Sequence, residues 1–163
     1  GGTMTEVYVF AAWSGTGKTA YLERLLPCVN QLGLTAAVVK HDVHGLVLDR
    51  PGKDSHRLFA AGAEATAVVC GGEVLLHRRS QPTLEEVLAL LPPTDLVLVE
   101  GFKQSHFPKI AIYRAGAGKP LAAEPEECLA VVTDTALDVP CPQFPLDEPA
   151  ALAAFLAAQH AGG

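Results

Sequence analysis

The stretch AAWSGTGKT, residues 11–19, follows the apolar, β-prone run VYVFA at residues 7–11. After it, leucine and valine residues recur at helical spacing up to Gly33, and a glycine at such a position is typical of a helix end. Pro27 lies inside this helical segment and predicts a kink, because its ring clashes with the carbonyl one turn earlier. The order strand, glycine-rich loop, helix is the context in which phosphate-binding loops occur.

This loop fits the pattern G-x-x-x-x-G-K-[ST] except at its first position, where Ala12 replaces glycine. Alanine adopts negative φ without strain, so we expect this change to matter little. Amides from Gly15 to Thr19 can line an anion site at the helix N-terminus, while Lys18 can reach the β and γ phosphates. The alternative is a turn that merely joins strand to helix. The predicted phosphate-binding residues are Ser14, Gly15, Thr16, Gly17, Lys18 and Thr19.

The hydroxyl of Thr19 is a predicted Mg²⁺ ligand, and such a site needs an acid at the end of a neighbouring hydrophobic strand. Glu100 ends the run DLVLVEG, residues 95–101, which is typical of a central strand covered on both faces. Its position favours metal binding over a surface salt bridge. Asp95, at the other end of the run, is expected to be a solvated turn residue.

A second candidate acid lies in KHDVHG, residues 40–45, after a predicted strand at residues 35–40. Asp42 can hold a Mg²⁺-bound water molecule or orient an attacking water molecule. The candidate catalytic residues are therefore Lys18 and Asp42. The predicted metal ligands are Thr19, Glu100 and Asp42. His41 and His44 are either transition-metal ligands or polar loop residues. Because residues 41–52 lack periodicity, they are expected to form a long functional loop.

The run CLAVVTD, residues 128–134, predicts a strand that ends at Asp134. A carboxylate there can accept hydrogen bonds from N1 and N2 of guanine, whereas adenine offers no matching donors. Asp134 is therefore a predicted nucleotide-binding residue, and a plain strand-to-turn aspartate is the alternative, because the fuller Asn-Lys-x-Asp pattern is absent.

The fold class follows from strands that alternate with helices, which predicts an α/β fold with a mostly parallel sheet flanked by helices, like that of P-loop NTPases. Gly71-Gly72, between two β-prone runs, indicates an inserted β-hairpin. A helix capped at Thr83 and a C-terminal helix capped by Asp147 complete the elements. Residues 4–160 are expected to form a single nucleotide-binding domain, with residues 1–3 a cloning remnant.

The composition of the chain indicates which classes of partner it binds. The formal net charge is -6, so no basic surface indicates nucleic-acid binding. The four cysteines form no C-x-x-C pair, and no apolar run is long enough to cross a membrane. These features favour a cytoplasmic protein that binds neither nucleic acid nor a membrane.

The stretches that carry a family resemblance are FAAWSGTGKT, VVKHDVHG followed by DRPGKDSHRLFAAGA, and DLVLVEGFK followed by PKIAIYR. They occur in the order found in the molybdopterin-guanine dinucleotide biosynthesis adaptor proteins, the MobB family, which the sequence closely resembles. The resemblance implies a homodimer that binds GTP with Mg²⁺ and assists the guanylyltransferase that joins GMP to molybdopterin, with molybdopterin itself a candidate ligand. It also implies weak GTP hydrolysis at most. Trp13 stands where dimeric relatives of the MinD type carry a signature lysine.

The leading hypothesis is thus a GTP-binding adaptor in molybdenum cofactor biosynthesis. Two alternatives remain open: a P-loop small-molecule kinase or ligase of the dethiobiotin-synthetase type, which also carries Glu-Gly after its central strand, and a metal-insertion GTPase that uses His41 and His44.

Overall fold

The computed structural model describes residues 4–42 and 54–162. The chain divides into two compact units, a main unit of residues 1–41 and 87–163 and a hairpin unit of residues 42–86. Each unit is described by itself. No helix in the described ranges is both long and apolar enough to cross a membrane.

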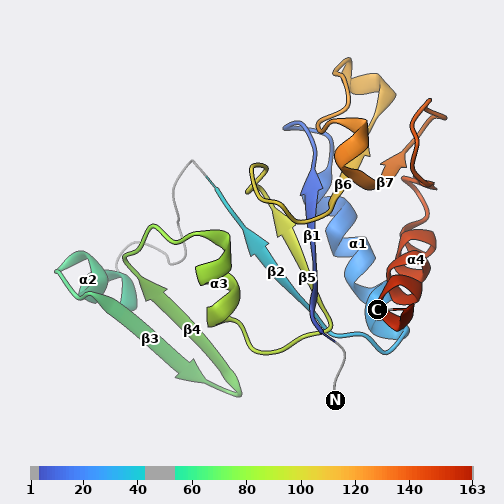
Figure 1. Cartoon of the computed structure of the whole chain (residues 1–163). Helices are drawn as coiled ribbons and strands as arrows, with labels where there is room; N and C mark the ends of the chain where they lie inside the picture. The colour runs from blue at the N-terminus through green and yellow to red at the C-terminus, as the bar shows by residue number, and fades with distance from the viewer. Residues whose placement is uncertain (1–3, 43–53, 163) are drawn as a thin grey trace. The chain divides into compact units, whose positions relative to one another are not determined.

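The main unit is built on a six-stranded sheet with the order β2-β5-β1-β6-β7-β8, in which every neighbouring pair is parallel (Figure 1). All carboxyl ends of the strands therefore lie at one edge of the sheet. The strands are β1 (Glu6–Ala11), β2 (Ala36–Lys40), β5 (Leu96–Glu100), β6 (Lys109–Tyr113), β7 (Cys128–Thr133) and β8 (Gln143–Pro145).

Two helices, α1 (Lys18–Gln31) and α4 (Pro149–Gly162), pack against each other on one face of this sheet (Figure 1). Side chains alternate between the faces along each strand, so Phe10 and its register partner Ile110 point to this same side. They belong to a buried cluster with Leu96, Leu98, Ile112, Val132, Leu22, Leu25, Val29, Leu152 and Leu156.

The first helix continues through Pro27 to Gln31 and ends as the sequence predicts. Gly33 has a φ of +84° and donates from its amide to the Asn30 carbonyl, while the Leu34 amide donates to the Val29 carbonyl. This pair of bonds is a Schellman motif, which requires a left-handed residue and explains the glycine.

The other face of β6 and β7 is covered by connecting segments. Ala111, Cys128 and Val131 pack there with Leu121 and Val139 from the loops. Burial raises the pKa of the Cys128 thiol to about 11. The segment between β6 and β7 contains two short 3-10 helices, η1 (Ala115–Ala117) and η2 (Pro125–Glu127).

The hairpin unit contains α2 (Asp54–Ala60) and the antiparallel strands β3 (Ala65–Cys70) and β4 (Glu73–Arg78). Gly71 and Gly72 both have positive φ, which the predicted tight hairpin turn requires. The helix α3 (Leu84–Leu90) begins with the predicted capping box: the Glu86 amide donates to the Thr83 hydroxyl, and the Thr83 amide donates to the Glu86 carboxylate.

The predicted α/β class with an inserted hairpin is confirmed. The strands predicted at residues 7–11, 35–40, 95–101 and 128–134 are present, with ends within one residue of those bounds. Strand β8 was not predicted, because its three residues between Pro142 and Leu146 carry no strand pattern. The helix α4 begins at Pro149, so Glu148, not Asp147, precedes its first turn. Most of the predicted loop at residues 41–52 lies outside the described residues.

Polar contacts connect several elements at the amino end of the sheet. The Thr35 amide and hydroxyl donate to Oδ2 of Asp95 at 2.8 and 3.1 Å. His160, buried near the end of α4, lies 3.2 Å from Oε1 of Glu6 and 3.4 Å from Oδ1 of Asp95. Asp95, directly before β5, is thus bonded both to Thr35, directly before β2, and to His160 of α4. The expectation of a solvated turn residue is wrong.

The hydrogen bond from the Thr35 amide, more than those from the Thr35 hydroxyl and His160, holds the pKa of Asp95 below its ordinary value. A depressed pKa contributes stability above the pKa of the unfolded chain, about 3.9, and this contribution disappears as the pH falls through the folded pKa. We therefore expect Asp95→Asn to lower Tm near pH 7 and the difference from the wild type to shrink below about pH 4. Thermal melts from pH 7 to pH 3, with the exposed Asp138→Asn as the control, check this. Parallel curves for Asp95→Asn and wild type over that range would contradict it.

Candidate functional site

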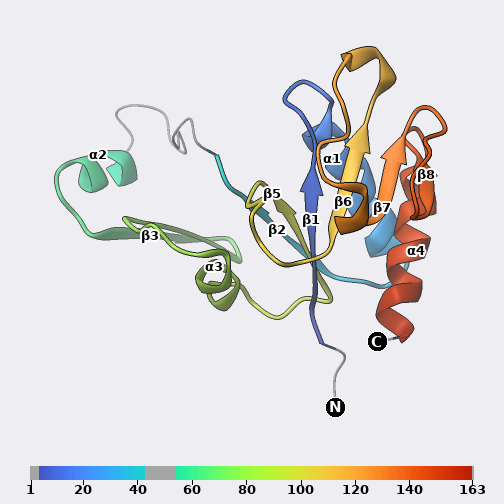
Figure 2. The ribbon, with the colours of Figure 1, turned by 45° about the horizontal axis from the view of Figure 1, so that its top comes forward.

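The glycine-rich loop lies at the carboxyl edge of the sheet, where β1 leads into α1 between β5 and β6 (Figure 2). Gly17 is the residue before the helix, with φ 83° and ψ 28°, and no side chain caps the first turn. The amides of Lys18 and Thr19 at that turn have no partner inside the helix, as at every helix N-terminus. Such a terminus is suited to a bound anion.

The replacement at the first loop position has no backbone cost. Among the described residues other than glycine, only Phe102 has a positive φ, so Ala12 adopts an ordinary conformation, and it is buried. The amide and hydroxyl of Thr16 both donate to the Trp13 carbonyl, at 3.2 and 2.6 Å. The Thr16 amide, expected to face an anion, is therefore engaged in a turn that shapes the loop.

The two main predicted metal ligands lie together. The hydroxyl of Thr19 donates to Oε1 of Glu100 at 3.0 Å, and Glu100 is only 5% exposed. Glu100 reaches this position because its register partner in β1 is Phe10, close to the start of the loop. A hydroxyl beside a buried carboxylate is an all-oxygen set of donors that fits Mg²⁺.

Lys18 lies in the same electrostatic environment. Burial lowers the pKa of its ammonium group, Glu100 opposes that shift, and the positive charges of Lys103 and Lys40 add to it. Several cations thus surround the loop of a chain whose net charge is -6. Their mutual repulsion favours the binding of an anion among them.

Directly after Glu100, the backbone at Gly101 comes unusually close to the backbone at His41. The His41 amide donates to the Glu100 carbonyl at 2.8 Å, and the backbone then turns through Gly101 and Phe102, with φ of 87° and 52°. A Cβ on Gly101 would lie 2.8 Å from the Cβ of His41 and 3.0 Å from its carbonyl oxygen. The His41 ring stacks on Phe102 at 4.4 Å between centroids.

Arg114, directly after β6, is a site residue for which the sequence reasoning assigned no role. Its Nε donates to the Thr16 carbonyl at 3.4 Å, and its Nη2 lies 3.4 Å from the position of a Cβ on Gly17. The sequence signal that could have identified Arg114 is its position directly after a strand, because the carboxyl ends of parallel strands meet at one edge of the sheet. That β6 lies beside β1 was not evident from the sequence.

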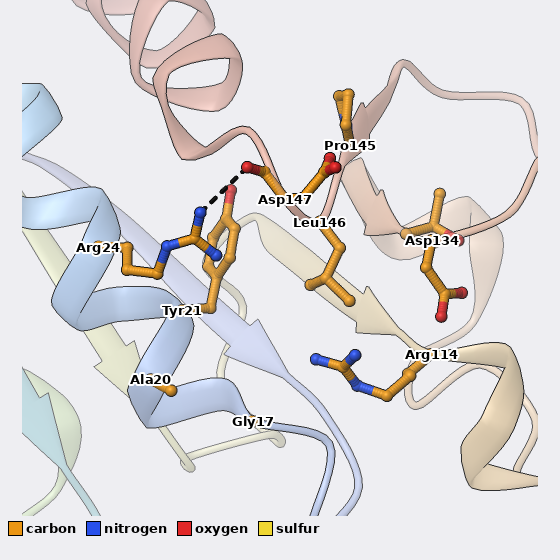
Figure 3. A pocket seen from close by; sticks show the side chains of 10 residues that line it. Gly17, Ala20, Tyr21, Arg24, Arg114, Asp134, Pro145, Leu146 and Asp147 are labelled. Carbon is orange, nitrogen blue, oxygen red and sulfur yellow. Dashed lines mark hydrogen bonds between the residues drawn. The ribbon is translucent and has the colours of Figure 1, made fainter.

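A pocket of about 360 Å³ opens beside Gly17, a volume within the range of small-ligand sites (Figure 3). In Figure 3 the Arg114 side chain extends toward Gly17, and Asp134 lies on the same side of the pocket as Arg114. Oδ1 of Asp134 accepts a hydrogen bond from the Ala115 amide at 2.9 Å. The lining residues are Gly17, Ala20, Tyr21, Arg24, Arg114, Thr133, Asp134, Pro145, Leu146 and Asp147.

The remaining predicted residues are less well placed. Ser14 lies on the glycine-rich loop and is exposed. Asp42 is exposed and belongs to the hairpin unit, so its metal and catalytic roles stay predictions. His44 lies outside the described residues. Within the described ranges, no three His, Cys, Asp or Glu residues gather as a metal site.

Comparison with known proteins gives consistent matches. The family model MobB, described as Molybdopterin guanine dinucleotide synthesis protein B, matches residues 7–134. A molybdopterin-guanine dinucleotide biosynthesis adapter protein of Escherichia coli (strain K12) is 36% identical over 168 residues, covering 96% of this chain and 94% of that protein. The protein of that name from Haemophilus influenzae is 37% identical, covering 78% of this chain and 74% of that protein. A crystal structure of Bacillus subtilis MobB matches with a TM-score of 0.77 at 27% identity, covering 97% of this chain and 99% of that one.

The close approach at Gly101 leads to a matched pair of substitutions. Gly101→Ala combines left-handed strain of about 1–2 kcal/mol with a clash against the His41 backbone. Gly33→Ala imposes similar strain at φ +84° with nothing within 4 Å of the new methyl group. We therefore expect Gly101→Ala to lower the free energy of unfolding in urea by clearly more than Gly33→Ala does. Equal losses would show that the approach relaxes without cost.

Proposed function

The chain belongs to the MobB family of molybdopterin guanine dinucleotide synthesis proteins, and we propose that it is a GTP-binding adaptor in molybdenum cofactor biosynthesis. In this role it holds GTP with Mg²⁺ and assists the guanylyltransferase that attaches GMP to molybdopterin. The observation that carries nucleotide binding is the uncapped terminus of α1 beside the Thr19–Glu100 pair.

The phosphates occupy the loop from Ser14 to Thr19. The terminal amides of α1 donate to phosphate oxygens, and the Lys18 ammonium group adds charge-assisted hydrogen bonds. Thr19 and Glu100 would hold Mg²⁺. When bound, the metal ion neutralises charge on the β and γ phosphates.

The nucleoside enters the pocket beside Gly17, where Asp134 selects guanine. Although Oδ1 of Asp134 already accepts the Ala115 amide, an ionised carboxylate has about four acceptor positions, so it retains capacity for the N1 and N2 donors of the base. The Ala115 amide also holds the carboxylate in a fixed direction. Arg114 supplies a positive charge between this pocket and the phosphate loop.

Weak hydrolysis is supported by the kinds of groups around the loop. Lys18, Lys103 and Arg114 are cations that bind charge, and the Glu100 carboxylate accepts a hydrogen bond from Thr19. Glu100 is the only buried acid in the part of the chain that the structure describes. Asp42, the candidate catalytic acid, is exposed. A site with this composition is better equipped to hold GTP than to activate a water molecule.

Titration with a fluorescent GTP analogue, with and without Mg²⁺, tests nucleotide binding. Lys18→Ala removes charge-assisted contacts worth about 1.5–3 kcal/mol each, so we expect affinity to fall about tenfold or more under both conditions. Glu100→Gln removes one negative charge from the metal site, so it should weaken binding only when Mg²⁺ is present.

Arg78→Ala and Asp138→Asn serve as controls for these two variants, because each removes one charge at a residue distant in sequence from both Lys18 and Glu100. Failure of the wild type to bind either GTP or GDP with Mg²⁺ would refute the proposal. Equal losses for Glu100→Gln with and without the metal ion would make Glu100 a structural residue. Equal affinity for ATP would favour a kinase or ligase of the dethiobiotin-synthetase type.

The homodimer is supported by the surface of the hairpin unit. Val69 and Val74 are cross-strand partners and are 77% and 69% exposed, and Leu75, Leu76 and Val68 are exposed as well. None of the described residues of α2 is buried. A two-stranded hairpin is marginally stable alone, so an apolar surface of this kind is suited to a second copy of the chain.

We expect Val69→Lys with Val74→Glu to convert the dimer to a monomer, because the pair makes the surface polar while opposite charges preserve cross-strand attraction. Light scattering coupled to size-exclusion chromatography measures the mass. Met4→Glu, at another highly exposed apolar residue, is the control and should remain dimeric. A charged pair that leaves the dimer intact would place the interface elsewhere.

A further inference from the structure

Trp13, the single tryptophan of the chain, lies in the phosphate loop with 40% of its surface exposed. Its Nε1 donates to the Pro120 carbonyl at 2.7 Å, so the edge of the indole is held while part of the ring remains open to solvent. An exposed tryptophan is a large apolar surface in water, and here no core packing accounts for it.

Two lysines from different loops flank this ring. The Nζ atoms of Lys103 and Lys119 each lie 5.6 Å from the ring centroid. Lys103 is three residues beyond Glu100 and its charge also acts on Lys18, whereas Lys119 comes from the loop after β6. A fixed aromatic surface with two mobile ammonium groups has the chemistry that binds a planar ring carrying phosphate.

The proposed nucleotide site leaves this surface unused. The pocket for the nucleoside is lined by Gly17, Arg114 and Asp134 and does not include Trp13. The Trp13 ring instead adjoins both Lys103, from the loop after β5, and Lys119, from the loop after β6. A ligand on the indole would therefore use a surface that does not line the nucleoside pocket.

We propose that Trp13, Lys103 and Lys119 form a binding site for a second ligand, a planar heteroaromatic ring with a phosphate group, which in this family is a pterin phosphate. The proposal deepens the proposed function, since it gives the adaptor a site for the second reactant beside GTP. The ligand ring stacks on the indole, and the two lysines move from the indole to pair with its phosphate. Because the side chains of Trp13 and Lys119 take no part in the proposed nucleotide site, both ligands bind at once.

The experiment uses the full chain and neopterin monophosphate as the probe, followed by isothermal titration calorimetry and by quenching of the single tryptophan. Titrations are run with and without saturating GTP and Mg²⁺. Neopterin, inorganic phosphate and AMP are run in parallel, to separate the contributions of the ring, the phosphate and any phosphorylated base.

Neopterin monophosphate should quench Trp13 saturably, with or without GTP, and bind more tightly than the other three ligands. Trp13→Ala should weaken its binding about tenfold or more, whereas Trp13→Phe, which keeps an aromatic face, should lose less. Lys103→Gln with Lys119→Gln should weaken binding and flatten its salt dependence, unlike the charge-matched control Arg57→Gln with Arg78→Gln. Far-ultraviolet circular dichroism spectra and thermal melts should match those of the wild type in all these variants, which shows that they are folded.

Unchanged binding in Trp13→Ala, or AMP bound as tightly as neopterin monophosphate, would overturn the inference. Displacement of the probe by GTP would also overturn it, because the indole would then hold the base of the nucleotide. A wild type that binds GTP but not the probe refutes this inference alone. A wild type that binds the probe but not GTP refutes the nucleotide proposal and leaves the Trp13 site standing.

Discussion

The site depends on the hydrogen-bonded register that holds β1 between β5 and β6. With Phe10 opposite both Glu100 and Ile110, the loop after β1 emerges between the loops that follow its two neighbours. Glu100 and Lys103 come from one side of the phosphate loop, and Arg114 and Lys119 from the other. A register shift of one residue in β5 would turn the Glu100 side chain to the opposite face of the sheet, so the parallel pairing determines which acid lies beside Lys18.

Much of this arrangement could be predicted from the sequence, because the informative signals are local. A glycine loop between a strand and a helix, and an acid after a buried strand, predicted the Thr19–Glu100 pair without knowledge of the fold. Arg114 and Asp95 could not be assigned, since their roles come from strand neighbours distant in sequence: Arg114 donates to a carbonyl 98 residues away, and Asp95 accepts from Thr35, 60 residues away. Local pattern cannot specify which strands are adjacent.

The described contacts are those of a protein that organises ligands. The phosphate loop is shaped by its own turn at Trp13 and Thr16, and Gly101 admits the close approach of His41 that ends β5 sharply after Glu100. In addition, the hairpin unit presents an apolar surface with no buried helix side chain of its own among the described residues.

The contact between Glu6 and His160 joins the two ends of the chain, although 154 residues separate them in sequence. It lies at the amino end of the sheet, and the phosphate loop lies at the carboxyl end (Figure 1). A domain fused ahead of β1 or after α4 would therefore begin at the edge of the sheet opposite the glycine-rich loop. In such a fusion the carboxyl edge of the sheet would stay accessible.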